Sequence, residues 1–174
     1  MGRKYLLALI LLILILVPTS LAKNNALIIE SYGIAQGSIS GEYERKMTNK
    51  ISLAIQGLAS KGNRQDLEYT GIGGGLGIKY YLSDQVLNGV YLGASASFIN
   101  MDVLNPTEGK VTSFGVAGSL GYKWVFETGL AVDVGFSLAM PVLTQITIPE
   151  SELQETVNFG TVGKGINLGL GFAW

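Results

Sequence analysis

Two neighbouring segments in the middle of the chain alternate between bulky apolar residues and small or polar residues. In residues 129–142 the even-numbered positions, from Leu130 to Val142, are bulky and apolar. The odd-numbered positions from 131 to 139 are Ala, Asp, Gly, Ser and Ala, and they lie on the opposite face. Residues 111–126 repeat the pattern, with aromatic and aliphatic residues opposite a face of Ser, Gly, Ala and Lys123. A period of two residues predicts β-strands.

The distribution of residues between the two faces indicates the surroundings of these strands. A soluble sandwich would have to fill its core with the small face, which contains Gly, Ser, Lys123 and Asp133. The opposite arrangement, with bulky residues facing lipid and small polar residues facing a narrow lumen, is typical of a transmembrane β-barrel. We therefore expect the apolar face to point outward.

The connection between the two segments is consistent with a hairpin. Opposed residues of an antiparallel pair point to the same face, so the two small faces meet only across a loop of odd length. The loop Glu127-Thr128-Gly129 has three residues and offers Gly for a left-handed conformation. This register places Lys123 directly opposite Asp133 inside the barrel, as a cross-strand ion pair.

Similar alternation through the rest of the chain predicts an all-β fold, an eight-stranded antiparallel up-and-down transmembrane β-barrel. An even strand number places both termini on one side, and strands of about 9–11 residues suffice to cross a bilayer. The expected strands are residues 25–34, 37–47, 51–58, 67–82, 89–102, 111–126, 129–142 and a last strand that ends at Trp174.

The expected loops fall into two groups by length. Those near 48–50, 83–88 and 127–129 are short and are assigned to the periplasmic side, whereas 60–66, 103–110 and 144–159 are longer and are assigned to the outside. The first outer loop, near Ala35-Gln36, is very short. The last outer loop contains Glu150, Glu152 and Glu155, which fit a solvated acidic loop, with a cation or partner site as the alternative.

The first 22 residues have the features of a secretory signal peptide. Arg3 and Lys4 precede an apolar run over residues 5–17, and Ser20-Leu21-Ala22 offers a small-residue cleavage site. The alternative, a membrane anchor helix, needs about 20 apolar residues. We expect residues 1–22 to be removed and residues 23–174 to form the barrel domain.

Composition excludes several function classes. Of 174 residues, 12 are basic and 13 acidic; without Arg3 and Lys4 the mature chain has 10 basic residues and a net charge of −3, which argues against nucleic acid as a partner. The chain has no Cys and no His, so disulfides, Ser-His triads and the commonest metal ligand are absent. Glycines between 71 and 77 match no nucleotide-binding pattern. We expect no enzymatic activity and no cofactor.

Charged residues on the predicted inner face form the candidate site. Their distances from the proposed periplasmic turns place them at a similar level inside the barrel. Buried charges are tolerated when they are paired, so a salt-bridge plug is the favoured interpretation, and a gate or a proton path is the alternative. A hydrolase that uses Glu42 and Glu44 as its two carboxylates is disfavoured, because neighbouring lysines keep both ionised and no general acid remains. The interior charge network consists of Glu42, Glu44, Lys79, Lys123 and Asp133.

Two segments, GSISGEYERKMTNKISL and GYKWVFETGLAVDVGFSLAM, resemble small bacterial outer-membrane barrels of the OmpA/OmpX-like superfamily, in particular barrel proteins of unknown function. The terminal LGLGFAW is similar to the signal that the barrel assembly machinery recognises, with Leu168, Leu170, Phe172 and Trp174 as its residues. The resemblance implies the bacterial outer membrane as location, with outer-membrane lipid and the assembly machinery as partners. It implies no established activity.

The sequence thus predicts a non-enzymatic outer-membrane barrel with a structural or surface-interaction role and an unidentified surface ligand. A narrow pore or small-solute channel is the alternative, because the inner faces are small. A lipid-modifying barrel enzyme ranks lower, since such enzymes generally need His.

Overall fold

The computed structural model describes residues 23–30, 37–64, 67–105, 108–148, 153–158 and 162–174. The predicted signal peptide and the loop near Ala35-Gln36 lie outside these ranges. Over the described ranges, no helix is long and apolar enough to cross a membrane.

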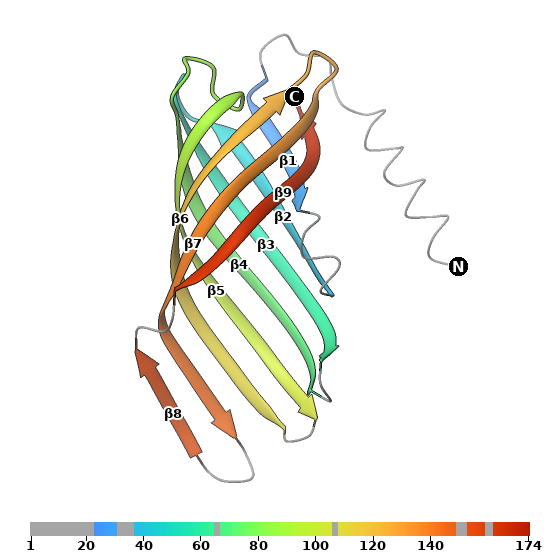
Figure 1. Cartoon of the computed structure of the whole chain (residues 1–174), viewed down its shortest axis with the longest axis vertical. Helices are drawn as coiled ribbons and strands as arrows, with labels where there is room; N and C mark the ends of the chain where they lie inside the picture. Colours follow the sequence, from blue (N-terminus) through green and yellow to red (C-terminus); the bar gives the residue numbers. More distant parts are fainter. Residues whose placement is uncertain (1–22, 31–36, 65–66, 106–107, 149–152, 159–161) are drawn as a thin grey trace, which may run out of the picture.

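Eight antiparallel strands close into a ring, which confirms the predicted fold class (Figure 1). The order around the ring is β1 to β7, then β9, which pairs with both β7 and β1. A ninth strand, β8, lies outside the ring and pairs with β7. The strands are β1 (Asn25–Glu30), β2 (Ser38–Lys46), β3 (Ile51–Arg64), β4 (Leu67–Tyr81), β5 (Gly89–Asn105), β6 (Gly109–Val125), β7 (Leu130–Ile148), β8 (Leu153–Asn158) and β9 (Gly163–Ala173).

The first and last strands of the ring meet at one seam. Leu27 of β1 lies opposite Phe172 of β9, and the backbone N–H groups of Asn24 and Asn25 donate to the carbonyl of Trp174 at 2.8 and 2.9 Å. The C-terminus therefore lies at the end of the barrel that carries the short turns, here called the turn end; the opposite end is the hairpin end (Figure 1). Closure pairs both edges of the sheet, so the ring has no free edge.

The two faces of the wall have the predicted orientation. On β7 the side chains of Val134, Phe136 and Leu138 point outward and are 38–45% exposed, whereas Ala131 and Asp133 point inward and are buried. Small inner residues are required because the ring is narrow. A Cβ atom on Gly121, for example, would lie 2.5 Å from the hydroxyl of Tyr91.

The prediction of loops at 60–66, 103–110 and 144–159 was largely wrong. Backbone pairing continues through Lys61–Arg64 of β3, and β5 and β6 extend to Asn105 and from Gly109. Most of the last predicted loop is a hairpin in which Leu143–Ile148 of β7 pairs with β8. In these extensions the alternation of bulky apolar with small or polar residues breaks down, as in Lys61-Gly62-Asn63-Arg64, although the backbone pairing persists.

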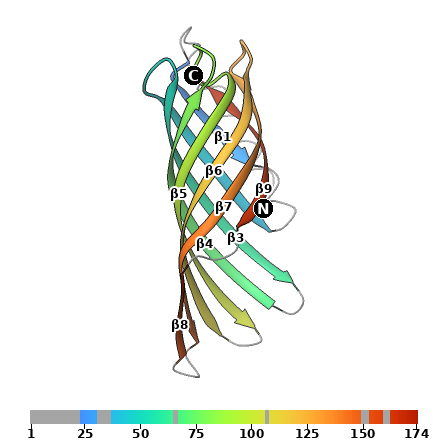
Figure 2. The ribbon, with the colours of Figure 1, turned by 60° about the vertical axis from the view of Figure 1, so that its left-hand side comes forward.

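The wall is therefore uneven in height. β3 to β7 run well beyond the ends of the short strands β1, β2 and β9, and β8 extends the tall side (Figures 1 and 2). The first strand, expected over 25–34, is described only to Glu30.

Candidate functional site: the interior charge cluster

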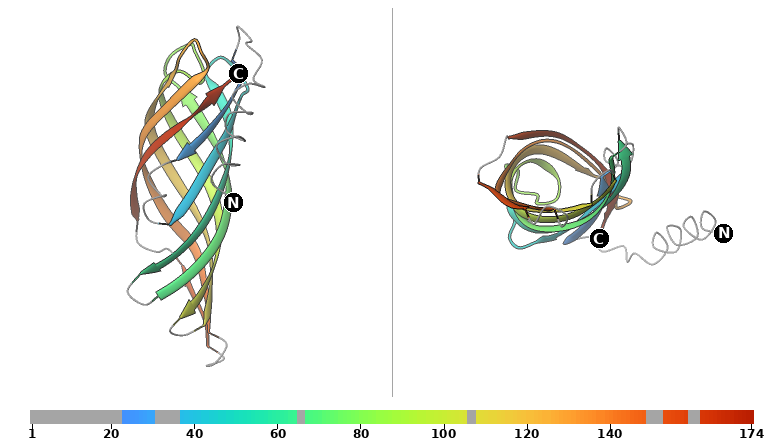
Figure 3. Two further views of the ribbon diagram at one scale, coloured as in Figure 1. Left: turned by 90° about the vertical axis from the view of Figure 1, so that its right-hand side faces the viewer. Right: turned by 90° about the horizontal axis from the view of Figure 1, so that it is seen from below.

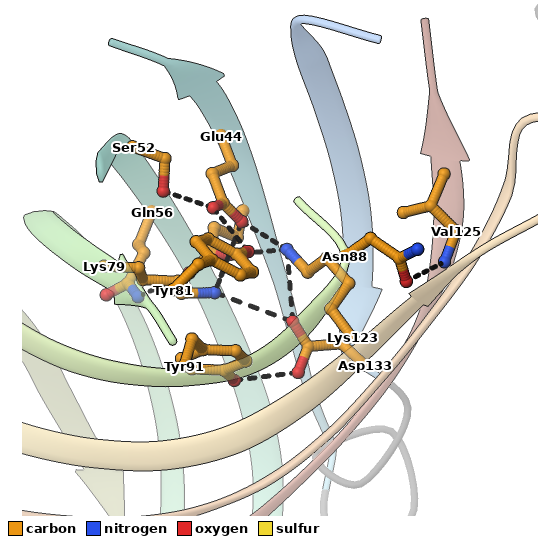
Figure 4. Close-up of polar contacts among 11 residues, drawn as sticks. Glu44, Ser52, Gln56, Lys79, Tyr81, Asn88, Tyr91, Lys123, Val125 and Asp133 are labelled. Atoms are coloured by element: carbon orange, nitrogen blue, oxygen red, sulfur yellow. Dashed lines mark hydrogen bonds and ion pairs between the residues drawn. The ribbon is translucent and has the colours of Figure 1, made fainter. Parts of the chain in front are cut away.

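Four strands from around the ring bring the five predicted charged residues together. β2 supplies Glu42 and Glu44, β4 supplies Lys79, β6 supplies Lys123, and β7 supplies Asp133. Each occupies an inward position of its strand, and none is more than 6% exposed. Figure 4 shows the charged ends of Glu44, Lys79, Lys123 and Asp133 converging inside the barrel.

The two lysines each contact all three carboxylates. The Nζ atom of Lys79 lies 2.5 Å from Glu42, 3.5 Å from Glu44 and 3.6 Å from Asp133. Lys123 lies opposite Asp133 in the β6–β7 register, at 3.2 Å between Nζ and Oδ2; it also pairs with Glu44 and lies 3.7 Å from Glu42. The cross-strand pair expected from hairpin parity is thus one contact within a wider network of all five residues.

Neutral side chains complete the hydrogen bonding of the carboxylates. Tyr81 donates to Glu44 at 2.7 Å, Tyr91 donates to Asp133 at 2.8 Å, and Gln56 donates to Glu42 at 3.0 Å. Ser52 also donates to Glu44. The Lys79 ammonium lies 4.4 Å from the centre of the Tyr91 ring, within the range of a cation–π contact.

The sequence contained a signal for these neutral partners. Alternation along β3 and β5 places Ser52, Gln56 and Tyr91 on the inner face, and Tyr81 lies two residues after the inward Lys79. Parity along a strand fixes the face of a residue, whereas the distance that a long side chain reaches across a lumen depends on the ring as a whole.

An apolar layer lies beside the cluster at the turn end. The 83–88 segment, predicted as a simple turn, folds inward and buries Val86 and Leu87 against Tyr81 and Tyr91. In the view from below, this light-green segment lies within the ring (Figure 3, right). The apolar pair Val86-Leu87 is the feature of the sequence that could have indicated this burial. We call residues 83–88 the cap.

Hydrogen bonds hold the cap in place. The Val86 N–H donates to the carbonyl of Asn49 at 3.1 Å, and Asn88 accepts from the Val125 N–H at 3.3 Å. Leu87 adopts a φ of 70°, a left-handed conformation that is uncommon for a residue with a Cβ atom. At the rim Asp84 pairs with Lys50 at 3.1 Å, and this hydrogen bond and charge raise the pKa of Lys50.

A cavity of about 260 Å³ lies on the other side of the cluster, toward the hairpin end. Glu42, Lys79 and Asp133 form its floor, and serines and glycines make up much of its wall. The lumen is therefore divided into an apolar cap, a charge cluster and a polar cavity. In the part of the chain that the structure describes, no three His, Cys, Asp or Glu side chains are arranged to hold a metal ion.

The four residues of the predicted assembly signal lie on β9 and at the C-terminus. Leu168 and Leu170 are exposed on the outer face, and the ring of Trp174 lies 6.3 Å from that of Tyr43. Phe172 packs over the 127–129 turn, close to Gly129. Glu150 and Glu152 of the predicted acidic loop lie outside the described residues, and Glu155 belongs to β8.

Comparison with known proteins identifies the fold. No protein-family model matches the sequence, and no curated protein matches it. Among solved structures, the chain is similar to Neisserial surface protein A, with a TM-score of 0.52 and 16% identity over 85% of this chain and 90% of that chain. It is also similar to the N-terminal β-barrel domain of Pseudomonas aeruginosa OprF, with a TM-score of 0.55 and 15% identity over 87% and 98%. The chain thus has the fold of small bacterial outer-membrane β-barrels.

Proposed function

We propose that this chain is a non-enzymatic integral protein of the bacterial outer membrane with a structural or surface-interaction role. The observation that carries the proposal is the combination of an apolar outer wall with a lumen that the charge cluster and the cap close toward the turn end. The wall suits lipid, and the closed lumen suits a protein that acts through its position and its outer surface rather than by transport.

The outer wall has the composition expected of a lipid-facing surface. Bulky apolar side chains cover it, and aromatic side chains lie near the turn end, where membrane barrels place an interfacial girdle. The exposed aromatic residues of this region are Tyr80, Tyr122, Trp124 and Phe126. We include outer-membrane lipid as a partner on this basis.

The tall hairpins support a role in surface interaction. The β3–β4, β5–β6 and β7–β8 hairpins project beyond the short strands at the hairpin end (Figure 2). In the proposed topology they reach outside the cell. They present paired backbone and carry charged side chains such as the Asp102–Lys110 pair, whose Nζ and Oδ1 atoms lie 3.7 Å apart.

Localisation and folding are tested together. We expect the full-length chain, expressed in a Gram-negative host, to lose residues 1–22, to fractionate with outer membranes, and to migrate differently on a gel before and after boiling. Recovery as a soluble periplasmic protein, or identical migration of both samples, would contradict the proposal.

A narrow pore is the second candidate, favoured by the polar cavity. A continuous path would have to cross both the charge cluster and the cap, and we therefore rank it lower. Planar-bilayer recording with the purified protein distinguishes the two functions: we expect no steady conductance, and a reproducible unitary conductance would favour the pore.

We further propose that the C-terminal residues serve as the signal for the barrel assembly machinery. The resemblance of LGLGFAW to such signals supports this role. Replacing Phe172 and Trp174 together by Ala should lower the amount of folded barrel in the membrane. The matched control replaces Phe136 and Ile166, which lie opposite each other on the outer face of β7 and β9 and do not belong to the signal. An equal loss in both variants would indicate a packing effect and no terminal signal.

A further inference from the structure

The polar cavity has the features of a ligand site rather than those of a packing defect. Hydroxyl and amide groups line it from several strands, and three apolar side chains, Ile28, Leu58 and Ile99, offer a dry surface. Sites for small ligands combine apolar contact with a few polar groups in this way. The polar neutral residues on the wall include Ser40, Gln56, Ser97, Ser137 and Asn167.

The charges around the cavity do not balance. The charged residues that line it are Glu30, Glu42, Asp133 and Lys79, and directly beneath them lie Glu44 and Lys123. These are four carboxylates and two ammonium groups, a formal surplus of two negative charges. A surplus in a partly desolvated lumen attracts a cation more strongly than the same charges would in water.

Of the carboxylates that line the cavity, Glu30 is the one that forms no ion pair with a described residue. Its register opposite Ser40 and Gly169 directs it inward, and it accepts a hydrogen bond from Ser40 at 2.7 Å. Among the described residues no lysine or arginine forms an ion pair with it, whereas Glu42 and Asp133 each pair with Lys79 and Lys123. Glu30 therefore retains the capacity to bind a cationic group.

The wall chemistry favours an organic cation over a metal ion. The cavity lacks a three-ligand metal group among the described residues. An ammonium group instead donates up to three hydrogen bonds, which the Glu30 carboxylate and the serine and asparagine oxygens are suited to accept. The aliphatic part of such a ligand would lie against Ile28, Leu58 and Ile99.

We propose that the lumen cavity is a binding site for short aliphatic amines, with Glu30 as the residue that pairs with the ligand ammonium group. The size of the cavity and its surplus of two charges fit a small mono- or diammonium compound. The inference concerns the cavity alone and does not depend on the role of the barrel in the cell.

The test uses the folded protein in uncharged detergent at fixed ionic strength, with 1,4-diaminobutane as the probe. Isothermal titration calorimetry compares it with 1,4-butanediol, which has the same length without charge, and with succinate, which has the opposite charge. We expect saturable binding of the diamine and none of succinate or the diol. Equal binding of diamine and diol, or no binding of the diamine, would overturn the proposal.

Variants assign the binding to the cavity. Glu30→Gln keeps an oxygen that accepts from Ser40 and should weaken diamine binding about tenfold. Glu127→Gln, the same change in the exposed turn at the other end, should leave the affinity unchanged. Ser97→Lys, which places an ammonium group in the cavity, provides a second variant and should also weaken binding.

Heat-dependent gel migration verifies that each variant is folded, so failure of binding is distinguishable from failure to form the barrel. Unchanged affinity in folded Glu30→Gln and folded Ser97→Lys, or an equal loss in Glu127→Gln, would show that the diamine binds elsewhere and would contradict the assignment.

Discussion

At the scale of single residues, Lys123 is a fully enclosed charge of the cluster. It is 0% exposed and contacts three carboxylates. The cluster has three carboxylates and two ammonium groups, so loss of a lysine enlarges its imbalance, whereas loss of a carboxylate removes it. Lys123→Met should therefore destabilise the barrel by about 3–5 kcal/mol, the usual cost of leaving a buried charge without its partner. Asp133→Asn should cost less, because Asn still accepts from Tyr91.

The same pair allows a test of coupling. In a double-mutant cycle on urea unfolding in lipid vesicles, the Lys123→Met/Asp133→Asn variant should lose less stability than the sum of the two single changes. Lys79 and the two glutamates remain to pair with each other. Strict additivity would mean that the two side chains do not interact in the folded barrel.

A second prediction at this scale concerns glycine. Gly129 has a φ of 93°, and an added Cβ atom would meet the Phe172 ring and lie 2.9 Å from the carbonyl oxygen of Ala173. Gly129→Ala should cost roughly 1–3 kcal/mol, measured by the same unfolding assay. Gly118 is the matched control, since an added Cβ atom there would have no other atom within 4 Å and its φ is ordinary. Equal destabilisation of Gly118→Ala would argue against the turn geometry as the cause.

At the scale of elements, strands within the ring were predictable and their extensions were not. Val134, Phe136 and Leu138 alternate with Gly135 and Ser137 because one face is apolar and the other small. Beyond the ring, residues such as Lys61 and Asn63 lie in a strand that carries no such contrast, so only backbone pairing defines it. The three-residue loop at 127–129 was enough to predict that Lys123 lies opposite Asp133, because the register of a hairpin depends on residues that are close in sequence.

The alternation of residues along each strand was enough to predict which charged residues face the lumen. The five charged residues lie on inner faces, but their mutual contacts, and those of Tyr81 and Tyr91, depend on ring diameter and strand tilt. Neither quantity is encoded in a local pattern. The burial of Val86 and Leu87 was missed because the four polar residues around them in the 83–88 segment are typical of a turn, and two apolar residues alone do not show that the segment folds into the lumen.

The cap and the cluster are separate layers, and this arrangement predicts a conductance experiment. Replacing residues 83–89 by Asn-Gly would join Leu82 to Val90, which already share a backbone hydrogen bond of 2.9 Å, through a tight hairpin turn. Planar-bilayer recording should detect no conductance for this variant, since the cluster still closes the lumen. A steady conductance after this change alone would mean that the cap is the main barrier and the cluster is not.

At the scale of the whole molecule, the structure places small and charged residues inside a narrow ring and bulky apolar residues outside. Closure of the ring gives each of the eight strands two hydrogen-bonded neighbours, which suits a hydrocarbon environment. The polar contents of the lumen are then enclosed by the wall. The central claim is this inside-out arrangement within a bilayer.

Site-directed fluorescence tests that claim most directly, because the chain contains no Cys and each introduced Cys is therefore a unique labelling site. Single Cys residues at positions 134 to 138 of β7 would carry a fluorophore in vesicles that contain brominated lipid. The account predicts strong quenching at 134, 136 and 138 and weak quenching at 135 and 137. The reverse alternation, or quenching without alternation, would contradict it.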